Sequence, residues 1–246
     1  MKNVRSLAVI VVGLFYVQCL FAQKNPVTDK VNHLTYSKNE LLGRIVPSPP
    51  LFSEIPMSCS SRSGMMLRVE VLNAFKELHQ AAEEEDVRLT VMSGTRTFSH
   101  QKSIWERKWV RPKYMGWSDI EKARDILSYS SMPGSSRHHW GTDVDLNSLE
   151  NEYFESGEGL KVYDFLERCA SDFGFYQVYT EKNRDSNANT RSGYEEEKWH
   201  WSYLPIANEM LKQYNSTISN QDIDGFKGAV SADSLKIIVN YVNGIF

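Results

Sequence analysis

Apolar and polar positions along the chain follow two different periods. Between residues 65 and 85, Val71, Phe75 and Leu78 recur at helical spacing with Glu and Lys between them, which predicts an amphipathic helix. Further helices are expected at 100–109, 118–127, 162–173, 206–214 and 232–241. Alternating or β-prone stretches predict strands at 87–91, 142–147, 175–179 and 198–203. Helices interleaved with short strands indicate an α+β fold with a small central antiparallel sheet flanked by helices.

The first twenty-two residues have the pattern of an export signal. Lys2 and Arg5 precede an almost wholly apolar run from Leu7 to Phe21, and a cleavage site is expected after Ala22. An uncleaved membrane anchor is the alternative, but the run is shorter than the ~20 residues that a membrane span needs. We therefore expect residues 1–22 to be a signal peptide and the mature protein to be exported, with no membrane span after cleavage.

The remaining chain divides into three expected segments. Residues 23–60, rich in proline after position 46, are expected to form an extended N-terminal arm, because proline blocks helices and central strands. Residues 61–215 would form the main domain, and residues 216–246 a helical C-terminal extension of open function. Cys59 and Cys169 remain after signal cleavage, and an oxidising compartment would permit a disulfide, although the sequence does not show that they meet.

The composition is that of an ordinary globular protein: 41% of the 246 residues are hydrophobic. The 28 Lys and Arg residues face 31 Asp and Glu residues, which gives a net charge of −3. This balance provides no basic field for nucleic acid, so we expect no nucleic-acid partner.

Two short segments concentrate residues that can perform chemistry. Three of the six histidines fall in residues 136–146 and 197–203, together with carboxylates and tryptophans. Two imidazoles and one carboxylate with an open fourth position form a catalytic zinc site, and a second carboxylate can take a proton from the bound water. The chain has no GxSxG, Walker, GxGxxG or CxxC motif that would indicate another chemistry.

Three sequence blocks resemble one known family. Residues 136–145 match the pattern SxHxxGxxxD, and residues 197–200 match ExWH. Residues 93–96 followed by Gln101 match SGxR...Q. In this order the blocks are similar to D-alanyl-D-alanine metallocarboxypeptidases and dipeptidases, zinc peptidases related to lysostaphin-type enzymes and to the hedgehog amino-terminal domain. The resemblance implies a single compact α+β zinc-peptidase domain.

The resemblance also implies roles for individual residues. Zn²⁺ would be bound by His138, Asp145 and His200. Glu197 would be the general base, and Arg96 would stabilise the oxyanion that develops during hydrolysis. Gln101 and Ser136 would lie in the substrate groove, with Ser136 contacting a terminal carboxylate.

Some residues in the same segments have alternative interpretations. His139 with Asp143 is a second candidate ligand pair, although the family register favours His138 with Asp145. Asp143 stands where many relatives carry alanine, and we expect it to be a hydrogen-bonding partner of the site. The tryptophans of both segments are expected to pack in the core or in groove walls.

The resulting hypothesis is an exported, monomeric zinc peptidase of the bacterial periplasm or exterior. Its substrates would be peptidoglycan stem peptides, from which it would remove D-alanine as a D-Ala-D-Ala carboxypeptidase. L,D-carboxypeptidase, D-Ala-D-Ala dipeptidase and stem endopeptidase activities stay open, because specificity depends on groove loops such as residues 181–193. A non-catalytic zinc-containing binding module is the alternative from another class.

Overall fold

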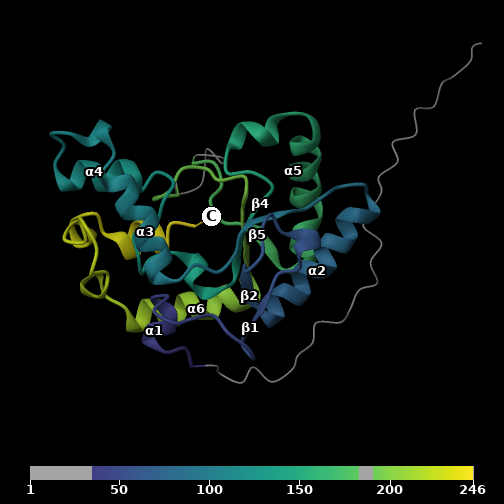
Figure 1. The fold of residues 1–246 in the computed structure, drawn as a ribbon, viewed down its shortest axis with the longest axis horizontal. Coiled ribbons are helices and arrows are strands. Elements are labelled where there is room, and N and C mark those ends of the chain that lie inside the picture. Colours follow the sequence, from purple (N-terminus) through teal and green to yellow (C-terminus); the bar gives the residue numbers. More distant parts are fainter. Residues whose placement is uncertain (1–34, 183–190, 246) are drawn as a thin grey trace, which may run out of the picture. The chain divides into compact units, whose positions relative to one another are not determined.

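Four short strands form an antiparallel sheet at the centre of the computed structural model, which describes residues 35–182 and 191–245 (Figure 1). The strand order is β3-β4-β6-β5, with bounds Val91–Ser93, Asp143–Leu146, His200–Tyr203 and Phe175–Gln177. Three of these strands lie within the predicted ranges. The strand expected at 87–91 instead starts at Val91, because only that end of the segment pairs with β4. The α+β class with a small antiparallel sheet is confirmed.

The expected signal peptide, the first part of the arm and most of the 181–193 loop lie outside the described residues. Among the helices that the structure does describe, none combines the length and the apolar character that crossing a membrane requires.

The segment expected to be an extended arm contains regular structure. Helix α1, Lys38–Leu41, begins at Ser37, whose side chain forms a capping box with Glu40. Strand β1, Phe52–Glu54, pairs antiparallel with β2, Met66–Arg68. This pairing also corrects the expected start of the next helix, since α2 spans Val69–Glu84 and not residues from 65 onward.

Helices α2 and α5 lie on one side of the central sheet (Figure 1). Phe75 of α2 meets Phe175 of β5 edge-on, with 6.2 Å between the ring centroids. Helix α5 spans Gly157–Cys169, and a 3₁₀ turn, Ala170–Phe173, continues it. Gly174 ends this turn with a φ of 82°, as the sequence predicts.

Helices α3, Phe98–Trp109, and α4, Asp119–Ile126, lie on the other side of the sheet (Figure 1). Ser118 caps α4, as expected. Helix α6, Leu204–Thr217, follows directly from β6. The helix expected at 232–241 is interrupted: α7 covers only Ser231–Ser234, Lys236 has a φ of 50°, and a π-helical turn follows at Ile238–Val242.

The described residues from Thr35 onward form one compact unit. The C-terminal segment packs with α3 and α4 in a shared hydrophobic cluster that includes Trp105, Ile126, Phe226 and Ile237. The parts assigned to an arm and to an extension are therefore packed with the main domain, and their boundaries stay predictions. Cys59 and Cys169 are both buried, and no disulfide joins them.

Candidate active site

The register of β4 against β6 places two carboxylates close to His200, one of the predicted zinc ligands. Asp145 lies opposite His200, and Asp143 lies opposite Ser202. Side chains of directly opposed residues project on the same face of a sheet and lie close together. The strand pairing alone therefore brings Asp145 to His200.

His138 reaches the same place from the 3₁₀ turn Arg137–Trp140, which immediately precedes β4. Gly141 ends this turn in the left-handed region, with a φ of 72°. A Cβ atom at this position would lie 2.5 Å from Cε1 of Phe52, so both the backbone and the space require glycine. The glycine of the SxHxxGxxxD pattern thus directs the chain from the histidine into the strand that bears the aspartate.

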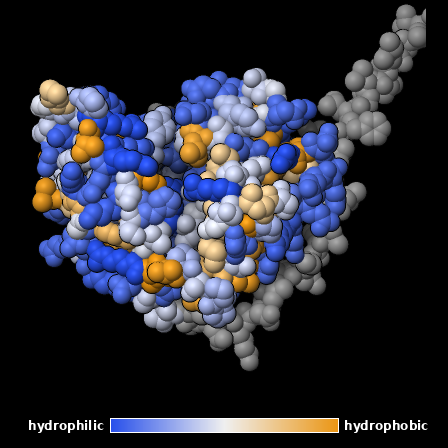
Figure 2. All heavy atoms as spheres, in the orientation of Figure 1, coloured by the Kyte–Doolittle hydropathy of each residue, from blue (hydrophilic) through white to orange (hydrophobic). Residues whose placement is uncertain are grey.

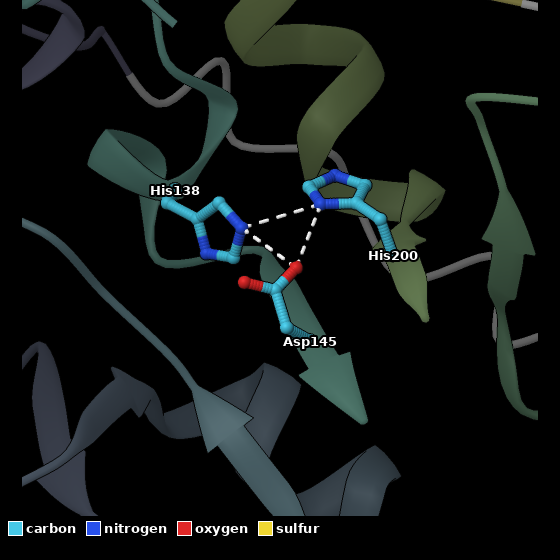
Figure 3. A group of neighbouring side chains, drawn as sticks. All are labelled: His138, Asp145 and His200. Atoms are coloured by element: carbon cyan, nitrogen blue, oxygen red, sulfur yellow. Dashed lines mark hydrogen bonds and ion pairs between the residues drawn. The ribbon is translucent and has the colours of Figure 1, made fainter. Parts of the chain in front are cut away.

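One side-chain atom from each of His138, Asp145 and His200 converges between these elements, and the three atoms form a triangle (Figure 3). His138 Nε2 lies 3.2 Å from Asp145 Oδ1 and 3.2 Å from His200 Nδ1. His200 Nδ1 lies 3.0 Å from the same Asp145 oxygen. All three residues are buried.

The second nitrogen of each imidazole fixes which atom faces this triangle. His138 Nδ1 lies 2.9 Å from the carbonyl oxygen of Gly94, and His200 Nε2 lies 2.9 Å from Asp143 Oδ2. Both partners are acceptors, so each of these nitrogens carries a hydrogen. In the neutral imidazoles, His138 Nε2 and His200 Nδ1 then present lone pairs to a carboxylate oxygen. Three converging acceptors need a cation, and this donor set suits Zn²⁺.

The pKa shifts of His200 and Asp145 also indicate that this site favours positive charge. Burial acts to lower the pKa of His200, but its hydrogen bonds to Asp143 and Asp145 outweigh burial and raise the pKa to about 9. Burial acts to raise the pKa of Asp145, but the neighbouring imidazoles and Arg96 hold it well below its usual range.

Glu197 lies at the edge of the triangle. Its Oε2 is 3.8 Å from His200 Nδ1, and its backbone N–H donates to the carbonyl of Tyr179 at 3.0 Å. Burial, and to a smaller extent the Asp145 carboxylate, raises the pKa of Glu197 to about 7. A carboxylate with such a pKa is suited to exchange protons at neutral pH.

Arg96 approaches the triangle from the turn that follows β3. Its Nη2 donates to Asp145 Oδ2 at 3.2 Å, and its Nη1 donates to Gln101 Oε1 at 3.1 Å. Gln101 is completely buried, and its Nε2 donates to the carbonyl of Ser131. The structure therefore places Gln101 behind Arg96, where it orients the guanidinium, and does not bring it to the lining of the two cavities described below.

The alternative pair of His139 and Asp143 points elsewhere. His139 Nδ1 donates to the carbonyl of Arg96 at 2.6 Å, and its Nε2 accepts from the N–H of Gly134, so both ring nitrogens are engaged. Asp143 accepts from Arg137, His200 and Ser202, as expected for a hydrogen-bonding partner of the site.

Two unequal cavities flank the triangle. A small pocket of about 20 Å³ is lined by His138, His200 and Ser136, among others. A wide groove of about 550 Å³ reaches the same three residues at Asp145, which forms part of its lining. Arg96 and Glu197 line both cavities. The Ser136 hydroxyl is buried at the small pocket and has no hydrogen-bond partner in the described part of the chain.

Comparison with known proteins places this site in a family. Residues 64–206, more than half of the chain, match the VanY family, described as D-alanyl-D-alanine carboxypeptidase. The chain belongs to the VanY family.

Curated relatives agree with this assignment at low identity. The chain is 26% identical over 144 residues to a D-alanyl-D-alanine carboxypeptidase of Enterococcus faecalis, covering 58% of this chain and 50% of that protein. It is 25% identical over 184 residues to the putative carboxypeptidase YodJ of Bacillus subtilis, covering 74% and 62%. The chain thus spans only about half to three fifths of the length of these relatives.

A solved structure supports the fold. The LdcB LD-carboxypeptidase superposes with a TM-score of 0.51 at 22% identity, covering 75% of this chain and 81% of that chain. At this identity the similarity concerns the fold alone.

Other residues at this VanY-family site were not singled out from the sequence. Arg137 is buried, donates to Asp143 from Nε at 3.1 Å and stacks on Trp140. Tyr179 stacks on the His200 ring at 4.6 Å between centroids. Arg137 adjoins His138 and could have been suspected from its position, whereas no local pattern marks Tyr179.

Proposed function

We propose that the protein is an exported zinc-dependent carboxypeptidase that removes D-alanine from peptidoglycan stem peptides. The observation that carries this proposal is the convergence of His138 Nε2, His200 Nδ1 and Asp145 Oδ1, with Glu197 beside them. Membership of the VanY family supports the reaction class. Export is supported only by the N-terminal sequence pattern.

In this proposal, His138, Asp145 and His200 hold Zn²⁺. A zinc ion bound there would supply a Lewis acid that activates water and polarises the scissile carbonyl. Glu197 would accept the proton of the attacking water and pass it to the departing amine. Arg96, held by Gln101, would stabilise the negative charge that develops on the carbonyl oxygen.

The unequal cavities favour removal of one terminal residue over cleavage within a chain. The wide groove has room for several residues of a peptide, whereas the small pocket admits only a small group. Ser136, with its unpartnered hydroxyl in the small pocket, is placed to bind the carboxylate of the departing residue.

The test is mass spectrometry of the purified mature protein incubated with pentapeptide and tetrapeptide muropeptides, with zinc and with a chelator. We expect loss of one alanine from the pentapeptide, abolished by chelation. Loss only from the tetrapeptide would establish L,D specificity, and a cut within the stem would establish an endopeptidase. Zinc binding without any cleavage would favour the binding module.

A further inference from the structure

The C-terminal segment, whose function the sequence leaves open, returns to a wall of the active site. Yellow in Figure 1, it packs beside α3 and then runs back toward the centre of the view. Its last described residues contact residues 191–194, which lie just before Glu197 in the chain. The segment is outside the family match at 64–206, so its contacts are not part of the pattern that defines the family.

The two segments meet at backbone distance. The buried Arg191 donates from Nη1 to the carbonyl of Gly244 at 3.3 Å. The Ser192 hydroxyl donates to the carbonyl of Asn240 at 3.0 Å. Gly193 has a φ of 85°, and a Cβ atom at this position would collide with the same Asn240 carbonyl oxygen. The C-terminal segment is therefore fixed directly against the backbone that carries the next residue, Tyr194.

Three tyrosine rings continue this contact to the small pocket. Tyr241 meets Tyr194 edge-on, with 5.1 Å between the ring centroids. Tyr194 in turn meets Tyr179 at 4.8 Å between centroids. Tyr194 and Tyr179 line the small pocket together with Glu197 and His200, whereas Tyr241 is outside this lining. Tyr241 thus stands behind a residue of the pocket wall.

The position of the Tyr194 ring decides how much space the small pocket has. The pocket measures about 20 Å³, which is room for about one water-sized group, so a small displacement of its wall changes this volume by a large fraction. The wide groove is less sensitive, since it is the open hollow at the top of Figure 2, between the part with α3 and α4 and the part with α5. Tyr194 is only 2% exposed, and in a close-packed interior such a ring moves only where a neighbour leaves room.

We propose that Tyr241 of the C-terminal segment determines specificity, because it holds Tyr194 against the small pocket and so restricts the departing residue to one with a small side chain. Tyr241 acts as a positioning residue: it touches Tyr194 and not the substrate. This inference rests on the proposed function, which assigns the small pocket to the departing residue. It gives residues 216–246 a role in substrate selection.

The test uses three synthetic peptides that differ only in the last residue. After the same D-alanine they end in D-alanine, in D-2-aminobutyrate, which has one more methylene group, or in D-leucine. Release of the terminal residue by the zinc-loaded protein gives kcat/KM for each peptide. We expect the wild-type protein to prefer D-alanine over D-2-aminobutyrate by about 10–200-fold, the discrimination that a pocket gives for one methylene group, and to disfavour D-leucine further.

Variants of the two rings assign this preference to their contact. Tyr241→Ala gives Tyr194 space to move away from the pocket, so the ratio of kcat/KM for D-alanine to D-2-aminobutyrate should fall by about tenfold. Tyr241→Leu should lower the ratio in the same direction, and Tyr241→Phe, which keeps the ring, should retain the wild-type ratio. Tyr194→Ala opens the wall directly, and adding Tyr241→Ala to it should lower the ratio no further.

Phe226→Ala is the matched control for loss of an aromatic ring. Phe226 belongs to the hydrophobic cluster against which Tyr241 packs, and its ring contacts Phe98 and Trp105, neither of which lines the small pocket. Thermal unfolding should show that this variant is destabilised, but its ratio of kcat/KM should stay at the wild-type value. An equal fall of the ratio in Phe226→Ala and Tyr241→Ala would show that any loosening of the fold has this effect and would overturn the proposal.

Contrary results are distinct for the pocket wall and for the reaction. Release of D-alanine with the same ratio in the wild-type protein and in Tyr241→Ala would overturn the role of Tyr241 while supporting the proposed function. Calorimetric binding of the three peptides to zinc-loaded Glu197→Gln reads the pocket without turnover. If the wild-type protein releases no terminal residue, but Glu197→Gln prefers the D-alanine peptide and Tyr241→Ala removes this preference, the proposed function fails and the role of Tyr241 stands. Equal binding of all three peptides, or no binding, would overturn that role.

Discussion

His200 Nε2 lies 2.9 Å from Asp143 Oδ2, on the side of the ring away from the triangle. The same carboxylate accepts from Arg137 Nε at 3.1 Å, and the side chains of both Asp143 and Arg137 are fully buried. A charged pair thus orients one of the three proposed metal ligands.

Removing Asp143 alone should destabilise the protein more than removing Arg137 and Asp143 together. Asp143→Ala leaves the Arg137 guanidinium buried without its counter-charge, and we expect a loss of about 3–5 kcal/mol in the free energy of unfolding. Arg137→Met/Asp143→Ala should recover most of this loss, because no unpaired charge remains. Urea unfolding measures both, and a double variant as unstable as Asp143→Ala would contradict the explanation.

Both of these variants should bind zinc more weakly. Without Asp143, His200 loses the acceptor that fixes its ring, and we expect the zinc affinity to fall by about 10–100-fold. Competition with a chromophoric chelator measures this. An unchanged affinity would show that the strand alone positions His200.

Zinc should stabilise the folded protein through the three converging acceptors. At a free concentration 100 times the dissociation constant, binding adds about 2.7 kcal/mol, so the melting temperature of the metal-free protein should rise by several degrees. His138→Ala should abolish this rise, and Mg²⁺, which prefers oxygen ligands, should not produce it. A rise with zinc that persists in His138→Ala would place the metal elsewhere.

Glu197→Gln separates metal binding from turnover. The amide keeps the size of the side chain but does not accept a proton from water, so kcat should fall by about 10²–10⁴-fold. Zinc content, measured by atomic absorption, should stay at the wild-type level, because Glu197 is outside the triangle. Near-wild-type turnover would show that another group is the base.

Gly141→Ala should destabilise the domain for two reasons that a matched variant separates. The left-handed backbone costs about 1–2 kcal/mol for any other residue, and the new Cβ atom also meets the Phe52 ring. Gly116 has a φ of 81° and open space around its Cβ position, so Gly116→Ala should show only the backbone cost. Thermal unfolding of both variants gives the difference. Equal losses would show that Phe52 moves aside freely.

The ion pair between Lys38 and Asp222 should depend on pH. Asp222 accepts from Lys38 and caps its own turn, and these hydrogen bonds lower its pKa. The stabilisation is therefore present above the usual aspartate pKa and is lost as the pH falls through the lower, folded-state value. The melting temperatures of the wild-type protein and of Asp222→Asn should differ by a constant amount above about pH 5, and this difference should shrink as the pH falls through the lowered folded-state pKa. Asp224→Asn, whose side chain is 66% exposed, should show a smaller difference throughout.

The convergence of the site could be anticipated because its residues lie in short contiguous blocks. Within such a block, spacing and one strand pairing decide which side chains meet, as with His138 and Asp145. Gln101 shows the limit of this reasoning. The sequence block predicts that Gln101 lies near the site, but it does not predict that its side chain accepts a hydrogen bond from Arg96.

The features that the sequence did not predict depend on contacts between distant segments. Strand β1 exists because Phe52–Glu54 pairs with Met66–Arg68, and neither segment is long enough to show a period. The wide groove arises where α3 approaches residues 149–152, which are more than 40 positions away. The break near Lys236 lies within a pattern that is uniformly helical in the sequence.

A fragment trimmed to residues 64–206 should be less stable than the longer chain. The indole N–H of Trp140 donates to the carbonyl of Leu41, and the Tyr214 hydroxyl donates to the carbonyl of Gly134. Arg191 donates to the carbonyl of Gly244. A fragment trimmed to the family match would leave buried polar groups of the active-site turn without partners. The segments on both sides of the family match therefore complete the hydrogen bonding of the turn that carries His138.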